Sequence, residues 1–170
     1  MYSKRTRLIF AVAAGFLGLW QLSIGSQFGW VTLVVVPLMV FGYYRYGPMV
    51  LGFQAYRKGD YNRLTNLLRE VSEPTLLRAQ DRAYYEFLRG VEAQHRGDFA
   101  AGRDHIRAAL AGPLRTRNMI GIAHLHLGEI ELAEGNSSAA RVAVADARKY
   151  AHREETLVRI EKLESRVAAI

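Results

Sequence analysis

The chain has no cysteine among its 170 residues, and this absence limits its chemistry. Disulfide bonds, a thiolate nucleophile and thiolate metal ligands are all excluded. No Walker-type phosphate loop, dinucleotide-binding glycine motif or serine nucleophile elbow occurs either. We therefore expect a protein that is not an enzyme and that binds no cofactor and no metal.

Histidines and paired carboxylates are present but form no evident site. His124 and His126 are two residues apart on an expected helix, so their side chains point about 200° apart and cannot share a metal ion. Glu129 and Glu131 are also two residues apart, and we expect both on solvated helix surfaces.

Acidic residues are missing from the amino-terminal part, because the first of them is Asp60. The net charge of the whole chain is +7, and four early basic residues supply +4 of it: Lys4, Arg5, Arg7 and Arg45. These residues flank apolar runs, so the basicity indicates a lipid bilayer and not a nucleic-acid partner. The basic residues that follow are expected to face lipid headgroups: Arg57, Lys58, Arg63 and Arg69.

Two apolar runs dominate residues 1–47. The first spans about 8–24 without a charge, the second about 30–46, and an uncharged five-residue turn at 25–29 joins them. Each run is near the short end of what crosses a ~30 Å hydrocarbon core. We expect a transmembrane helical hairpin, with a re-entrant or interfacial hairpin as the alternative. A signal peptide would be followed by a polar chain, not by a second apolar run.

The flanking charges predict the orientation of this hairpin. Basic residues precede the first run and follow the second, whereas the turn carries no charge. By the positive-inside rule both termini are cytoplasmic. Because Arg outnumbers Lys 19 to 4, we expect a GC-rich bacterial genome and therefore the cell inner membrane.

The first run carries a face of small residues, which allows another helix to approach closely. These residues are Ala11, Ala14, Gly15 and Gly18. They pack either against the second run or against a foreign membrane subunit.

A pair of glycines occurs three times after the hairpin. Gly52, Gly90 and Gly128 lie at intervals of 38 residues, and a second glycine follows each of them by seven residues, at Gly59, Gly97 and Gly135. A fixed period of this length indicates stacked helical repeats. We expect the first glycine of each pair to lie mid-helix against a neighbouring helix, and the second to end that helix. The Asp or Asn that follows should cap the next helix.

This pattern resembles the tetratricopeptide repeat (TPR) family of helix-turn-helix units. The small twentieth position of the family is matched by Gly102 and Ala140 but not by Leu64, so the first copy is the most degenerate. The resemblance implies an all-α fold in which residues 48–170 form a TPR-like α-solenoid of repeats at about 48–73, 74–112 and 113–151. The alternative is an unrelated helical bundle with Gly-Asp turns.

The helices can be placed within these repeats. After a second helix over about 60–71, we expect continuous helices from Pro74 to Arg96, from Asp98 to Ala111, from about Leu114 to Glu134, and over 137–150. A capping helix over 153–168 should then cover the last repeat with an apolar stripe, Leu157, Ile160, Leu163 and Val167. The alternative for this stripe is a coiled coil between two copies.

In TPR proteins the first helices of the repeats line a partner groove. The resemblance assigns the following residues to that groove: Phe53, Tyr56, Tyr84, Phe87, Val91, Gln94, Ile122, His126 and Glu129. The alternative is that several of them belong to the core between helices. The Lys, Asn and Arg clamp of chaperone-binding members is missing, so we expect an apolar helix or extended segment as the bound partner.

Two functions are consistent with this organisation. The first is a membrane-anchored scaffold or adaptor that mediates protein-protein interaction at the cytoplasmic face, with a soluble or membrane protein as partner. The second is a non-catalytic accessory or assembly subunit of a larger, multi-subunit membrane complex.

Overall fold

The computed structural model describes residues 49–71 and 73–169, together with Phe16, Trp20, Ser23, Ile24, Trp30, Val31 and Val34. The chain divides into two compact units, Met1–Pro48 and Met49–Ile170. The described residues contain helices and no strand, so the predicted all-α class is confirmed for them.

The predicted hairpin, with its spans at 8–24 and 30–46, lies almost wholly outside the described residues. The small-residue face, Ala11, Ala14, Gly15 and Gly18, also lies outside them. Within the described part of the chain, no helix combines the length and the apolar character needed to cross a bilayer.

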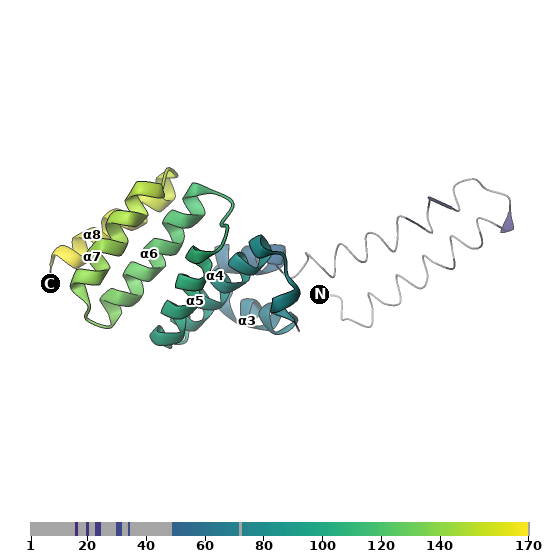
Figure 1. Ribbon diagram of the computed structural model, residues 1–170, viewed down its shortest axis with the longest axis horizontal. Helices are drawn as coiled ribbons and strands as arrows, with labels where there is room; N and C mark the ends of the chain where they lie inside the picture. The colour runs from purple at the N-terminus through teal and green to yellow at the C-terminus, as the bar shows by residue number, and fades with distance from the viewer. Residues whose placement is uncertain are drawn as a thin grey trace. The chain divides into compact units, whose positions relative to one another are not determined.

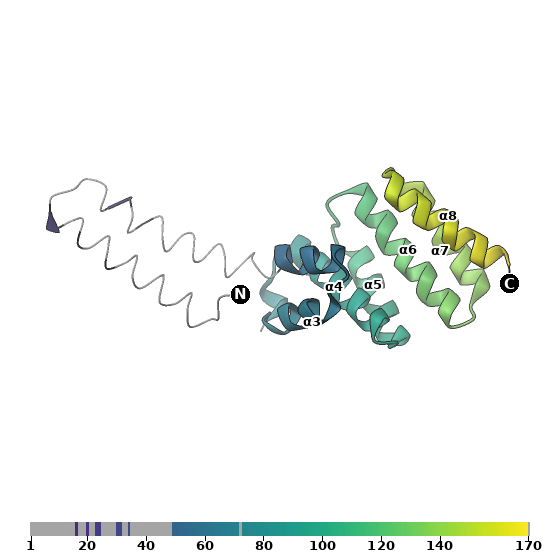
Figure 2. The same ribbon diagram turned by 180° about the vertical axis from the view of Figure 1, so that it is seen from behind.

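The second unit is a row of helices that pack in antiparallel pairs (Figures 1 and 2). A helical segment over 49–57 comes first. It is followed by α3 (Tyr61–Arg69), a 3-10 turn η1 (Pro74–Leu76), α4 (Ala79–His95), α5 (Phe99–Ala111), α6 (Arg117–Ala133), α7 (Ser137–Tyr150) and α8 (Glu154–Ala168). α4 packs along α5 and α6 along α7, α5 contacts α6, and α8 contacts both α6 and α7.

The three repeated turns have one backbone conformation. The glycine of each turn has a positive φ, 69° at Gly59 and 81° at both Gly97 and Gly135. Side chains with a Cβ rarely adopt this conformation, so glycine is required there. The predicted end of the preceding helix at each of these glycines is confirmed.

Two of the three predicted helix caps are confirmed, and the third is wrong. Asp60 accepts a hydrogen bond from the backbone N–H of Arg63, and Asp98 accepts one from that of Ala101. The Asn136 side chain makes no capping bond to α7. Its Nδ2 donates instead to Oε2 of Glu131, at 3.0 Å, so the bond to that buried carboxylate sets the orientation of the amide.

The mid-helix glycines lie where neighbouring helices approach closely, as predicted. A Cβ on Gly90 would lie 2.7 Å from the Ile106 side chain and 3.1 Å from the carbonyl oxygen of Gly102, both on α5. A Cβ on Gly128 would lie 3.1 Å from Val144 on α7. The missing side chain is what lets each pair of helices pack at this distance.

Two helices begin later than predicted. The expected helix from Pro74 is interrupted, because Leu77 and Arg78 are extended with ψ near 147° and 149°, so α4 begins at Ala79. The extension places Leu77 against the core while Leu76 stays exposed. The helix expected from Leu114 begins at Arg117, where the Thr116 hydroxyl caps it by accepting from the Met119 N–H.

The buried residues form two clusters. The larger one joins the segment 49–57 to α3, α4, α5 and part of α6. The smaller one is closed by Ile160, Leu163 and Val167 of α8, which are 0 %, 2 % and 3 % exposed against α6 and α7. Three of the four stripe residues are therefore buried within the chain, as predicted for a capping helix, and Leu157 is half-buried, so little of the stripe is left for a coiled coil.

Candidate ligand-binding pocket

A pocket of about 390 Å³ opens between five helices of the second unit. We call it the polar pocket and define it by its lining residues: Tyr61, Val91, Gln94, His95, Phe99, His126, Glu129, Ala133, Arg159 and Arg166. They come from α3, α4, α5, α6 and α8. The pocket therefore depends on the order in which these helices stack.

Hydrogen bonds connect one wall of the polar pocket to the helix at 49–57. Nδ1 of His126 lies 2.8 Å from Oε1 of Gln94, and Nε2 lies 2.9 Å from the Tyr56 hydroxyl. Nδ1–H of His126 donates to the amide oxygen of Gln94, and the tyrosine hydroxyl can either donate to Nε2 or accept from it. His126 is thus held from both sides by residues on two other helices.

Glu129 continues this network toward α8. Its Oε2 accepts a hydrogen bond from Nε2 of Gln94 at 3.0 Å and lies 3.2 Å from Nδ1 of His126. Its Oε1 accepts from Nη2 of Arg159 at 3.1 Å. We call Tyr56, Gln94, His126, Glu129 and Arg159 the polar network, and it connects four helices that are distant in sequence.

The network shifts the acid-base properties of its members. Burial opposes the charged form of Glu129, but hydrogen bonds from His126 and Gln94 and the charges of His126 and Arg159 outweigh it and lower its pKa to about 2. Burial raises the pKa of Tyr56, and the nearby Arg159 partly offsets this. Glu129 is therefore an anion throughout the physiological range, and the tyrosine stays protonated.

Aromatic rings pack behind the network. Phe87 contacts His126 and Tyr56 edge-on, with ring centroids 5.7 Å and 5.4 Å apart, and stacks on Phe53 at 5.9 Å. Phe53 also meets Tyr84 at 5.3 Å. These contacts fix the imidazole in an otherwise apolar environment.

The structure divides the nine predicted groove residues into three groups. Val91, Gln94, His126 and Glu129 line the polar pocket, and Tyr56 reaches it through the network. Phe53, Tyr84 and Ile122 pack partly buried outside it. Phe87 is 0 % exposed and belongs to the core between helices, which was the alternative to a place in the groove.

The expectation that Glu129 and Glu131 are simply solvated is wrong. Glu129 belongs to the polar network, and Glu131 is buried on the opposite side of α6. Oε1 of Glu131 accepts from Nε of Arg103 on α5 at 2.9 Å, and Arg107 lies 3.4 Å from the same atom. The two carboxylates are paired by residues from neighbouring helices, which their spacing in the sequence did not reveal.

The sequence did not single out the two arginines of the pocket, Arg159 and Arg166. They lie seven residues apart on the expected capping helix, next to its apolar stripe. Residues at this spacing share one side of a helix, and this was the one signal for them. Asn118 of α6 positions their helix, because its Oδ1 accepts from the N–H groups of His152 and Arg153 just before α8.

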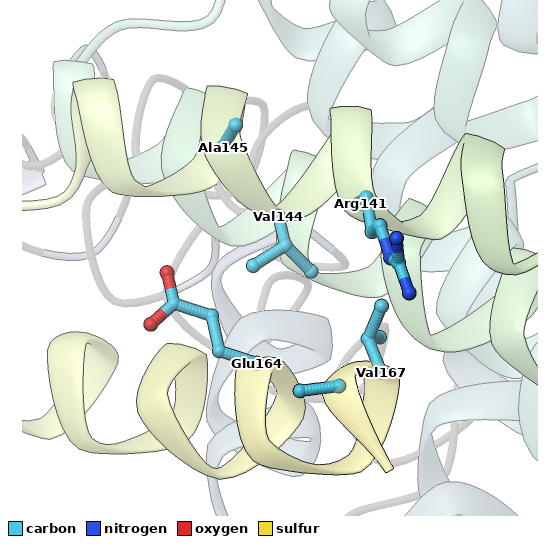
Figure 3. A pocket seen from close by; sticks show the side chains of 6 residues that line it. Arg141, Val144, Ala145, Glu164 and Val167 are labelled. Atoms are coloured by element: carbon cyan, nitrogen blue, oxygen red, sulfur yellow. The ribbon is translucent and has the colours of Figure 1, made fainter. Parts of the chain in front are cut away.

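A second pocket of about 440 Å³ lies between α7 and α8 (Figure 3). Arg141 and Val144 from α7 face Glu164 and Val167 from α8 across it. Arg141 and Glu164 lie at its edge without a bond between them, since Glu164 instead accepts from Arg148 at 2.7 Å. This pocket has no hydrogen-bonded network comparable to that of the polar pocket.

Neither pocket resembles a metal centre. Among residues 49–71 and 73–169 and the few described earlier ones, no group of three or more His, Asp or Glu side chains is placed to hold an ion.

No protein-family model matches the chain, and the searches of curated proteins and of solved structures find no similar protein.

Proposed function

We propose that the protein is a membrane-anchored, TPR-like scaffold or adaptor that binds another protein at the cytoplasmic face of the bacterial inner membrane. The polar pocket is the observation that carries this proposal, since it is formed by side chains from five helices, α3, α4, α5, α6 and α8, and is large enough for side chains of a partner. The anchor is the hairpin expected from the two apolar runs at 8–24 and 30–46.

The TPR-like assignment is supported by the repeated turns. Glycines with positive φ at intervals of 38 residues end the segment 49–57 and the helices α4 and α6 at equivalent places. In each case the glycine seven residues earlier lies against another helix. A solenoid of this kind presents the first helices of its repeats side by side, which is where Val91, Gln94, His126 and Glu129 lie.

Purification from native membranes tests the proposal. The tagged full-length protein is extracted in a mild detergent, and the proteins that accompany it are identified by mass spectrometry. We expect a partner that is reduced at least about fivefold by His95→Ala, because His95 is exposed and lines the pocket. His152→Ala is the matched control, since His152 is exposed but lies outside the pocket. Equal recovery with both variants contradicts a pocket-bound partner.

The accessory-subunit function remains the second candidate, because the small-residue face of the first apolar run suits a contact with a foreign membrane helix. For that function, Gly15→Leu and Gly18→Leu are the damaging changes and His95→Ala is harmless. A fixed ratio of integral membrane proteins in the purified sample is the expected result.

A further inference from the structure

We infer that the polar pocket binds an acidic segment of the partner protein, with Arg166 and Arg159 of α8 receiving its carboxylates. This inference rests on the proposed function and names the chemistry of the partner.

The first argument is the arrangement of charge in the pocket. Arg159 and Arg166 both line it, and Glu129 is its one acidic lining residue. Nη2 of Arg159 binds Glu129, whereas Arg166 has no ion-pair partner among the described residues. Among the residues that the structure describes, one guanidinium is therefore uncompensated, and a planar guanidinium matches a carboxylate through two parallel hydrogen bonds.

The second argument is that Glu129 cannot repel the ligand strongly. Both of its oxygens are occupied, Oε1 by Arg159 and Oε2 by Gln94, with His126 nearby. The carboxylate is neutralised by its own partners and orients Arg159. Arg159 also bonds to the Tyr56 hydroxyl, but its side chain is 45 % exposed, so part of its guanidinium stays accessible.

The third argument is the apolar part of the pocket, which favours a peptide over a free anion. Tyr61 stacks on His95 with ring centroids 3.8 Å apart, and Phe99 adds apolar surface. A volume of about 390 Å³ far exceeds the space that an isolated carboxylate fills. The pocket therefore suits an acidic side chain with an apolar side chain beside it.

Fluorescence anisotropy with the full-length protein in detergent tests the inference. The probe is a short fluorescein-labelled peptide of alternating glutamate and leucine, and a glutamine-leucine peptide is its uncharged control. We expect binding of the glutamate peptide alone. Arg166→Ala should weaken it about tenfold, which is the scale of one charge-assisted bidentate contact. Lys162→Ala should change it less than about twofold, since Lys162 carries the same charge on α8 outside the pocket.

A charge reversal adds a gain of binding that loss of folding cannot imitate. Arg166→Glu should abolish binding of the glutamate peptide and create binding of a lysine-leucine peptide. Three results overturn the inference. The first is that Arg166→Ala and Lys162→Ala weaken binding of the glutamate peptide equally. The second is that the glutamine peptide binds as well as the glutamate peptide. The third is that millimolar inorganic phosphate displaces the glutamate peptide and that this displacement depends on Arg166. The last result makes the pocket a general anion site.

The proposed function is judged separately from this inference. A partner that depends on His95 but has no acidic segment, together with no glutamate-peptide binding, rejects the inference and leaves the adaptor function intact. Peptide binding without any partner from native membranes supports an acidic ligand for the pocket and rejects the adaptor function.

Discussion

The hydroxyl of Tyr56 lies 2.9 Å from Nε2 of His126, although the two residues are 70 positions apart in the chain. His126 lies 38 residues after Leu88, which is fully buried at the equivalent place of the preceding repeat. A polar side chain thus occupies a position that the preceding repeat fills with an apolar one, and its hydrogen bonds connect the segment 49–57 to α6.

A double-mutant cycle measures the strength of this connection. Tyr56→Phe leaves Nε2 of His126 without its partner, so the free energy of unfolding should fall by roughly 1–3 kcal/mol. In a His126→Leu background the same change should cost less, because the bond to His126 is already absent and only the one to Arg159 is lost. Chemical denaturation of the four proteins gives the coupling energy. Additive effects of the two changes contradict an energetically significant bond.

Acid should weaken the fold through Glu129. Its pKa falls from 4.5 to about 2 in the folded chain, so its carboxylate stabilises the fold above pH 4.5. This stabilisation is lost as the pH falls through the window from about 5 to about 2. The advantage of the wild type over Glu129→Gln in free energy of unfolding should therefore shrink by roughly 2 kcal/mol across that window.

The control for this titration is Glu161→Gln on α8. Glu161 is exposed and has no ion pair among the described residues, so its difference from the wild type should stay nearly constant with pH. Parallel pH profiles for Glu129→Gln and the wild type contradict the assigned network.

Gly90→Ala should destabilise the protein, even though alanine is the better helix former by about 1 kcal/mol. The added Cβ would lie 2.7 Å from Ile106, closer than real Cβ contacts, and 3.1 Å from the carbonyl oxygen of Gly102. Overpacking of this kind lowers stability by typically 1–3 kcal/mol. Thermal unfolding followed by circular dichroism measures it. If Gly90→Ala instead has a higher melting temperature than the wild type, the site has room for a Cβ, and the tight α4–α5 contact is contradicted.

The predicted membrane topology can be measured without removing native thiols, because the chain has no cysteine. Ser26→Cys lies in the expected external turn at 25–29, and Ser165→Cys lies on the exposed side of α8. A membrane-impermeant maleimide should label Ser26→Cys on intact cells but label Ser165→Cys only after the membrane is opened. Labelling of Ser165→Cys on intact cells refutes a cytoplasmic repeat domain.

Features set by the local backbone were predictable from the sequence. A glycine that ends a helix with positive φ, such as Gly97, depends on a few neighbouring residues, and so does the cap that Asp98 provides. Gly90 was predictable too, because glycine inside a helix is unfavourable unless another helix lies close by.

Features that depend on partners from distant helices were not predictable. Asn136 follows its turn glycine as Asp98 does, yet its side chain bonds to the buried Glu131. In the sequence Glu129 resembles a surface carboxylate, because its partner Arg159 lies on the distant helix α8. Phe87 could not be assigned to groove or core, because both surfaces of a packed helix favour aromatic residues and only the position of the neighbouring helices separates them.

The interpretation of Phe87 changes the choice of groove variants. Because Phe87 is 0 % exposed, its replacement by alanine should lower the free energy of unfolding by about 3–5 kcal/mol. Loss of a partner in that variant would report unfolding and not groove recognition. The exposed pocket residues His95 and Arg166 separate the two effects.

Site-directed photo-cross-linking in native membranes tests the central proposal most directly. A photoreactive side chain at Ala133, which is exposed and lines the polar pocket, should capture one discrete partner protein. The same side chain at Ala108, which is exposed on α5 outside the pocket, should not. A partner captured equally from both positions, or captured from Gly15 or Gly18 and never from Ala133, would contradict an adaptor that binds its partner in this pocket.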